Sequence, residues 1–214
     1  MTNRYPPLPA TQAPPSGIII ERVRPEIDGG RYPIKRVVGD VLQVSADIFK
    51  DSHDKIAAVL QYRRTSDADW QEAEMRLVDN DRWMGEFLLP DNTRYLYTIA
   101  AFPDQWATWR DEVAKKHDAG QDVALEIVEG RLILEEARDR ASGADREVLE
   151  AAIGIAGGAA TQPAKVQHLL GDDVAFAMQR ARSRAGEARY ARELAVVVDR
   201  PAARFAAWYE FFPR

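Results

Sequence analysis

The stretch that decides the fold class is Val41-Leu42-Gln43-Val44-Ser45-Ala46-Asp47-Ile48-Phe49. Every second side chain in it is apolar: Leu42, Val44, Ala46 and Ile48 fall on one face of an extended chain. A period of two is typical of a β-strand that buries one face. We therefore predict a strand here, packed on an apolar core.

Other short segments of the same character lie around it, at residues 18–23, 56–62, 70–78, 82–89 and 95–102. Clusters of Asp, Asn, Ser and Pro separate them, as turns do. Six or seven short strands at regular spacing predict an antiparallel β-sandwich. We assign residues 17–109 to it.

The pattern changes to a helical one after this region. Apolar residues recur at three- and four-residue spacing between Asp122 and Ala141, which predicts an amphipathic helix; they are Ala124, Leu125, Ile127, Val128, Leu132 and Leu134. Three more helices are expected: one that ends at Gly157-Gly158, one that opens at Thr161-Gln162-Pro163, and one capped by Asp172.

A single strand-like segment, residues 194–198, follows these helices. A lone strand needs a sheet, so we expect it to return to the sandwich beside residues 95–102. Residues 110–192 would then be an inserted helical bundle, and the sandwich would be discontinuous, made of residues 17–109 and 193–203. The expected fold class is mixed β and α.

Composition excludes several classes of protein. The chain has 214 residues, a net charge of −5 and no cysteine, so a disulfide framework or thiolate site is excluded and nucleic-acid binding is disfavoured. Residues 1–16 are Pro-rich and lack the apolar core of a signal peptide, so we expect a flexible lead. With no apolar run long enough for a membrane span, we expect a cytoplasmic protein without a membrane partner.

The titratable residues suggest no active site. His53, His117 and His168 lie about fifty or more residues apart, and no ligand spacing for zinc joins them. The adjacent carboxylates of Glu135-Glu136 and of Asp172-Asp173 would diverge on a helix. Asp28-Gly29-Gly30 fits a turn better than a phosphate loop. We expect no catalytic, cofactor-binding or metal-binding residue and no cofactor.

Two features leave alternatives open. Trp106 and Trp109 share a face only if their segment is helical; they could pack internally or contact a glycan or partner. The last residues are aromatic, with Phe205, Trp208, Tyr209, Phe211 and Phe212 close together. Such a tail would expose a large apolar patch, so we expect residues 204–214 to be a linker that docks on a domain beyond Arg214.

The chain resembles the N-terminal region of the bacterial alpha-1,4-glucan:maltose-1-phosphate maltosyltransferases, members of the alpha-amylase superfamily. Segments in the same order carry the likeness: residues 24–40 with Asp28-Gly29-Gly30-Arg31, His53-Asp54, Asp81-Arg82-Trp83, Trp106-Ala107-Thr108-Trp109-Arg110-Asp111, Lys115-Lys116 and Trp208-Tyr209-Glu210.

The resemblance implies an immunoglobulin-like sandwich with an inserted helical bundle, followed in the family by a catalytic barrel that this sequence lacks. It implies a non-catalytic assembly and dimerisation module that reaches alpha-glucan and maltose 1-phosphate only through the whole enzyme, with that barrel and a second copy as partners. The chain alone would then be inactive. The alternative is a free-standing glycan-binding β-sandwich protein.

Overall fold

A computed structural model describes residues 17–205 and residue 212, and it combines strands and helices. The chain divides into two compact units. The sheet unit holds the described parts of Met1–Asp51, Ala57–Phe102 and Gly186–Arg214, and the helical unit holds Ser52–Ile56 and Pro103–Ala185. The boundary expected at residue 110 falls inside a helix, α1 (Gln105–Asp118). Residues 1–16, the expected lead, lie outside the described residues, as do Trp208, Tyr209 and Phe211 of the expected docking tail.

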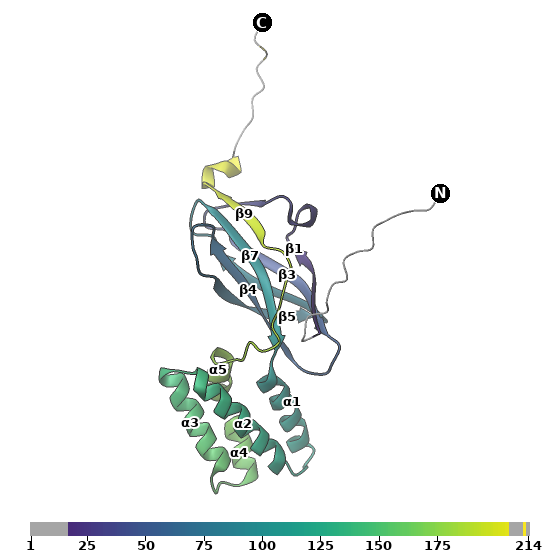
Figure 1. Cartoon of the computed structure of the whole chain (residues 1–214), viewed down its shortest axis with the longest axis vertical. Helices are drawn as coiled ribbons and strands as arrows, with labels where there is room; N and C mark the ends of the chain where they lie inside the picture. Colours follow the sequence, from purple (N-terminus) through teal and green to yellow (C-terminus); the bar gives the residue numbers. More distant parts are fainter. Residues whose placement is uncertain (1–16, 206–211, 213–214) are drawn as a thin grey trace, which may run out of the picture. The chain divides into compact units, whose positions relative to one another are not determined.

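The sheet unit is one curled sheet in which neighbouring strands follow the order β1-β3-β6-β5-β4-β7-β9-β2, with β8 paired to β7 (Figure 1). The strands are β1 (Ile18–Arg24), β2 (Ile34–Val37), β3 (Val41–Lys50), β4 (Ile56–Arg64), β5 (Gln71–Asp79), β6 (Arg82–Leu88), β7 (Arg94–Pro103), β8 (Ala188–Arg189) and β9 (Leu194–Asp199). All strands predicted from the sequence are present.

The alternation that predicted β3 is confirmed by burial. Leu42, Val44, Ala46 and Ile48 are at most 1% exposed. Strand β3 pairs antiparallel with β6, so that Val44 lies opposite Gly85 and Leu42 opposite Phe87. The buried face of β3 therefore faces the core, and Gln43 and Ser45 point to the other side, as the period of two requires.

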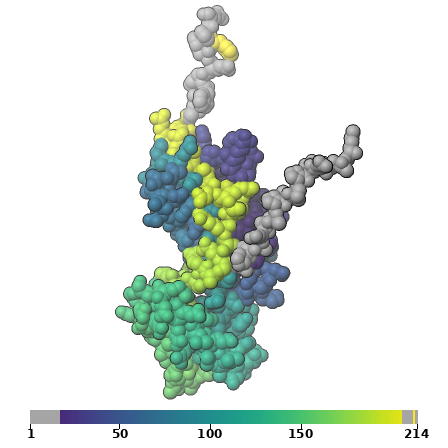
Figure 2. Space-filling view, viewed as in Figure 1, coloured from purple at the N-terminus to yellow at the C-terminus, as the bar shows by residue number. Residues whose placement is uncertain are grey.

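Strand β9 returns to the sheet beside β7, with Tyr95 opposite Val196, which confirms the pairing expected for residues 194–198. The short strand β8 also pairs with β7, with Ala188 opposite Ala101. In the sequence the helices lie between β7 and β8, so the chain leaves the sheet and rejoins it at neighbouring positions. Figure 2 shows this returning segment, in yellow-green, on the surface of the sheet unit.

The expectation of a wholly antiparallel sheet is wrong at one pair. Strand β2 runs parallel to β9, with Ile34 opposite Val196 and Val37 opposite Asp199. Only a hairpin forces neighbouring strands to be antiparallel. These two strands are far apart in the sequence, so the chain between them is free to enter β9 in either direction.

Within the described residues the helical unit contains five α-helices: α1, α2 (Ala124–Arg140), α3 (Gly143–Gly157), α4 (Gln162–Leu169) and α5 (Asp172–Arg180). Four were predicted, and α1 was not. The Asp104 carboxylate accepts a hydrogen bond from the Ala107 backbone N–H at 2.9 Å, which caps the start of α1. Helix α5 is capped by Gly171 instead of Asp172, which lies in its first turn.

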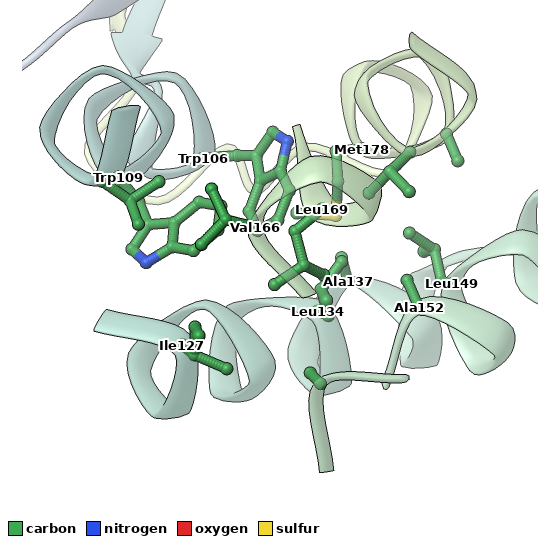
Figure 3. Packing of buried hydrophobic residues seen from close by; sticks show 14 of the residues in the cluster. Trp106, Trp109, Ile127, Leu134, Ala137, Leu149, Ala152, Val166, Leu169 and Met178 are labelled. Atoms are coloured by element: carbon green, nitrogen blue, oxygen red, sulfur yellow. The ribbon is translucent and has the colours of Figure 1, made fainter. Parts of the chain in front are cut away.

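The face that α2 buries differs from the one its large apolar residues suggest. Ile127, Leu134 and Ala137 are at most 5% exposed. Leu125 is 69% exposed, and Val128 and Leu132 are each 55% exposed. Figure 3 shows Ile127, Leu134 and Ala137 directed into a cluster with Trp106, Trp109 and residues of α3, α4 and α5.

Two short 3₁₀ helices complete the described chain: η1 (Asp28–Gly30) and η2 (Pro201–Phe205). In η1, Gly29 has a φ of 62° and the Arg31 backbone N–H donates to the Asp28 carbonyl at 3.1 Å. The turn predicted for Asp28-Gly29-Gly30 is therefore confirmed, because a left-handed φ at this position suits glycine.

Candidate functional site

The histidines weighed as metal ligands lie on separate elements. His53 is exposed between β3 and β4, His117 lies on α1 and His168 on α4. Among residues 17–205 and 212, no group of three or more His, Asp or Glu side chains is placed to hold a metal ion.

The carboxylate pairs diverge as expected for neighbours on a helix. Glu135 pairs with Arg131 along α2 at 2.8 Å, while Glu136 is exposed. Asp172 and Asp173 are both exposed in the first turn of α5. Their negative charges interact favourably with the helix dipole there.

Trp106 and Trp109 pack inside the helical unit. They are 5% and 4% exposed, and their rings stack with centroids 4.4 Å apart. The Trp109 indole N–H donates to the Glu126 carbonyl at 2.6 Å. Of the two alternatives, internal packing is the correct one, because rings buried to this extent offer no face to a glycan.

The two tryptophans in the described part of the sheet unit, Trp70 and Trp83, are half-buried. The Trp83 indole N–H donates to the Ile48 carbonyl at 3.1 Å. The Trp70 ring lies near two guanidinium groups, those of Arg63 at 4.8 Å and Arg189 at 4.7 Å from the ring centre. Cation–π contacts of this kind stabilise the packing of the two arginine side chains against the Trp70 ring.

A hydrogen-bonded cluster joins the start of the sheet unit to the returning segment. The Tyr190 hydroxyl donates to Glu26 at 2.6 Å, and the Arg192 guanidinium donates to Glu26 at 2.9 Å. Burial, and then the bond to Glu26, raise the pKa of Tyr190. The cluster holds the segment that leads into β9 against the turn after β1.

One exposed apolar surface lies at the end of the sheet where β9 leads into η2. Val41 is 51% exposed, and Leu88, directly opposite it in the β3–β6 register, is 54% exposed. Phe205, the last residue of η2, is 84% exposed. We call these three residues the apolar end.

Backbone hydrogen bonds fix the strands at this end. The Gly39 N–H donates to the Leu89 carbonyl and the Leu89 N–H donates to the Asp40 carbonyl, both at 2.9 Å. The Arg204 guanidinium donates to the Asp40 carboxylate, next to Val41, so η2 is tied to the same end. Exposed apolar side chains on a fixed backbone are typical of a surface that another protein covers.

The sequence reasoning missed Val41 and Leu88, although a signal was present. Both lie on the solvent side of their strands, where the neighbouring positions are polar: Gln43 and Ser45 on β3, and Glu86 on β6. An apolar residue in the polar half of an alternating strand marks an exposed contact position.

No helix within residues 17–205 and 212 combines the length and apolar character that crossing a bilayer requires.

Comparison with known proteins gives a consistent result. The family profile described as alpha-1,4-glucan:maltose-1-phosphate maltosyltransferase, domain N/S, matches residues 16–200. Curated proteins named alpha-1,4-glucan:maltose-1-phosphate maltosyltransferase are similar to this chain in Myxococcus xanthus (44% identical over 204 residues), Chlorobaculum tepidum (41% over 199) and Rhodospirillum rubrum (36% over 223).

These matches cover most of this chain but a small part of the relatives. They span 92%, 92% and 98% of the chain, and 31%, 29% and 32% of the respective relatives. The chain therefore corresponds to less than a third of each of these proteins.

Proposed function

The chain belongs to the domain N/S family of the alpha-1,4-glucan:maltose-1-phosphate maltosyltransferases, and from this premise we propose that it is a non-catalytic assembly module of such an enzyme. The whole enzyme would transfer maltosyl units from maltose 1-phosphate to alpha-1,4-glucans. The module's own task would be to hold the catalytic part of the polypeptide through the apolar end.

We assign the chemistry to the part of the relatives that this chain does not span. A retaining glycosyl transfer needs a carboxylate nucleophile and a carboxylic acid about 5 Å apart. We expect neither Glu135-Glu136 nor Asp172-Asp173 to meet this requirement, because adjacent residues of one helix point in different directions. Substrates would reach this module only as part of the whole enzyme.

The observation that carries the proposal is the apolar end. Covering one large apolar side chain contributes about 1.5–3 kcal/mol, and Val41, Leu88 and Phe205 are all more than half exposed. A partner that covers all three would gain part of this amount from Val41 and Leu88 and most of it from Phe205. The chain after η2 starts from this same end, so a following domain is well placed to dock there.

The experiment is reconstitution of a split enzyme. The segment of the Myxococcus xanthus relative that follows its matched region is purified and mixed with this chain and an alpha-1,4-glucan acceptor, and phosphate release from maltose 1-phosphate is measured. We expect no release by this chain alone and a gain on mixing. The variant Val41→Lys/Leu88→Glu should lose that gain. Turnover by the chain alone that disappears when one of its carboxylates is removed would refute the proposal.

Three finer features belong to the same proposal. We take the curled sheet to be an immunoglobulin-like sandwich, since its strands are short and mostly antiparallel. We take the module to contribute to a homodimer of the enzyme and the enzyme to be cytoplasmic, in keeping with the absence of cysteine. Sedimentation of the whole enzyme tests the dimer.

One observation favours the alternative, a free-standing glycan-binding protein. Two adjoining hollows of about 430 and 330 Å³ share Met84 on the outer face of the sheet and are lined by polar side chains, including Gln43, Glu86 and Arg76. Polar side chains around an apolar platform can bind a sugar chain. Calorimetry with maltoheptaose tests this: saturable heat that Met84→Lys abolishes supports the alternative, and no heat excludes it.

A further inference from the structure

A small cavity with polar and apolar lining lies at the start of α1 in the helical unit. Its volume is about 20 Å³. Its lining includes Asp104 and Trp106 at the start of α1, Arg140 at the end of α2, and Arg182 and Ser183 after α5. The chain enters the helical unit at Pro103 and leaves it at Ala185, so the cavity lies beside both of these positions.

The Trp106 indole N–H is a buried donor without an acceptor. Trp106 is 5% exposed, and its Nε1 has no hydrogen-bond partner among the described residues. The stacked Trp109 is buried equally, but its N–H has an acceptor in the Glu126 carbonyl. A buried donor left unsatisfied lowers the free energy of unfolding by about 1–3 kcal/mol. A ligand that accepts this hydrogen bond would remove that cost.

Figure 3 shows the two indole nitrogens pointing in different directions. The nitrogen of Trp109 points toward α2, which carries Ile127. The nitrogen of Trp106 lies at the end of its ring that is farther from Leu134 and Ala137, on the side of Met178. Trp106 and Met178 both line the cavity.

Acceptors for a bridging ligand lie in the same cavity. The Asp104 carboxylate accepts from the Ala107 N–H through Oδ1, and its Oδ2 lies 3.7 Å from a guanidinium nitrogen of Arg182. Both side chains of this ion pair are largely buried, at 15% and 12% exposed. Ser183 Oγ accepts a hydrogen bond from the Ala185 N–H at 3.2 Å. The hydroxyl proton of Ser183 rotates with the O–H bond. A carboxylate oxygen and a hydroxyl oxygen can each accept more than one hydrogen bond.

We propose that this cavity is a binding site for one ordered water molecule. The water accepts a hydrogen bond from the Trp106 indole N–H and donates to the Asp104 carboxylate and to Ser183 Oγ. A cavity needs about 10–15 Å³ and two to four polar partners to hold a water, and this one meets both conditions. Arg140 and Arg182 also line the cavity, so an anion such as chloride is the competing occupant.

This water would link the two points at which the chain enters and leaves the helical unit. Asp104 and Trp106 belong to the start of α1, and Ser183 lies in the segment that returns to β8. Trp106 is then a positioning residue: it fixes the first turn of α1 relative to the end of the inserted segment.

Nuclear magnetic resonance of the intact chain labelled with ¹⁵N-tryptophan tests the proposal directly. The five tryptophans give separate indole signals, and Trp106→Phe and Trp109→Phe assign two of them. We expect a nuclear Overhauser effect between the Trp106 indole proton and a long-lived water, and none for Trp109. Absence of the Trp106 effect would overturn the proposal. So would a shift of the Trp106 signal when chloride replaces sulfate, because it would indicate an anion.

The same two variants give an independent thermal test. Each replaces a stacked, buried indole by a benzene ring, so the loss of packing is matched. If a water satisfies Trp106, both variants lose a hydrogen bond and their melting temperatures should fall by similar amounts. If the N–H is unsatisfied, Trp106→Phe removes a cost, and its melting temperature should exceed that of Trp109→Phe by more than about 4 °C, which would contradict the proposal.

Discussion

Gly130 on α2 lies directly against the indole ring of Trp109 on α1. A Cβ atom at position 130 would lie 2.4 Å from Trp109 Cζ2, well inside van der Waals contact. Trp109 is also held by its hydrogen bond to the Glu126 carbonyl, one turn earlier on α2. The close approach of α1 and α2 therefore depends on the absence of a side chain at residue 130.

Replacing Gly130 by alanine should destabilise the helical unit. The added methyl group has to displace a buried, hydrogen-bonded indole, and such overpacking costs about 1–3 kcal/mol. Gly154→Ala on α3 is the matched control, because a Cβ there meets nothing within 4 Å. That control should stabilise the protein by about 0.5–1 kcal/mol through helix propensity. Urea unfolding measures both; equal effects of the two changes would contradict this account of α1 and α2.

Tyr97 should contribute to stability through its hydroxyl. The side chain is 1% exposed and donates to the Pro25 carbonyl at 2.6 Å. Tyr97→Phe should cost about 0.5–1.5 kcal/mol at neutral pH. Tyr62→Phe, which keeps the ring that stacks on Phe87, is the control for loss of a hydroxyl from the sheet.

The same residue should also affect stability at high pH. Burial raises the pKa of Tyr97 above its ordinary value of 10.0. Above that pH the unfolded chain releases the phenolic proton while the folded chain keeps it, so the free energy of unfolding should fall as the pH rises. Tyr97→Phe should weaken that fall. An unchanged slope between about pH 9.5 and 11 would show that other groups cause it.

Glu126 should give the helical unit part of its acid sensitivity. The Lys116 ammonium group donates to its carboxylate at 2.5 Å, and this bond lowers the pKa of Glu126 below its ordinary value of 4.5. A lowered folded pKa contributes stability above pH 4.5 that is lost as the pH falls through the folded value.

Glu126→Gln and Lys116→Met should therefore flatten the loss of stability below about pH 4.5, each by removing one partner. Urea unfolding midpoints over that range measure the slope. The Glu126–Lys116 pair would be excluded as the cause if only one of the two variants changed it.

The apolar end should control self-association and have little effect on stability. Val41→Lys/Leu88→Glu removes two exposed apolar side chains and places opposite charges at directly opposed positions of β3 and β6, an arrangement that a sheet accepts. We expect a change in unfolding free energy within about 0.5 kcal/mol and less self-association in sedimentation. Ile19→Lys, at another exposed apolar position on β1, is the control.

Deletion of residues 205–214 should act like the double variant. A large loss of stability on that deletion would mean that the tail packs into the sheet unit.

Some features could be predicted from local sequence alone. The alternation of residues 41–49 predicts β3 because burying one face of a strand requires apolar side chains at every second position, whatever the neighbouring strand is. Four helices follow from apolar spacing and from their glycine and proline boundaries.

Helix α1 could not be predicted in the same way. Its buried residues are Trp106, Trp109 and Val113, which are too few to give a clear period along the helix. Its formation depends on the cap from Asp104 and on a core that other helices supply.

The buried face of α2 was decided by tertiary structure. Its apolar residues lie on two sides, and their spacing predicts a helix without showing which side is buried. The fold buries Ile127, Gly130 and Leu134 and leaves Leu125, Val128 and Leu132 exposed, because Trp109 fills the space that only a glycine leaves free. Likewise, the parallel pairing of β2 with β9 and the exposed position of Val41 opposite Leu88 depend on which distant strands become neighbours. The sequence by itself determined which segments are strands and helices, since these depend on near neighbours along the chain. Which faces are covered depends on contacts between segments far apart in the chain, and the tertiary structure alone decided that.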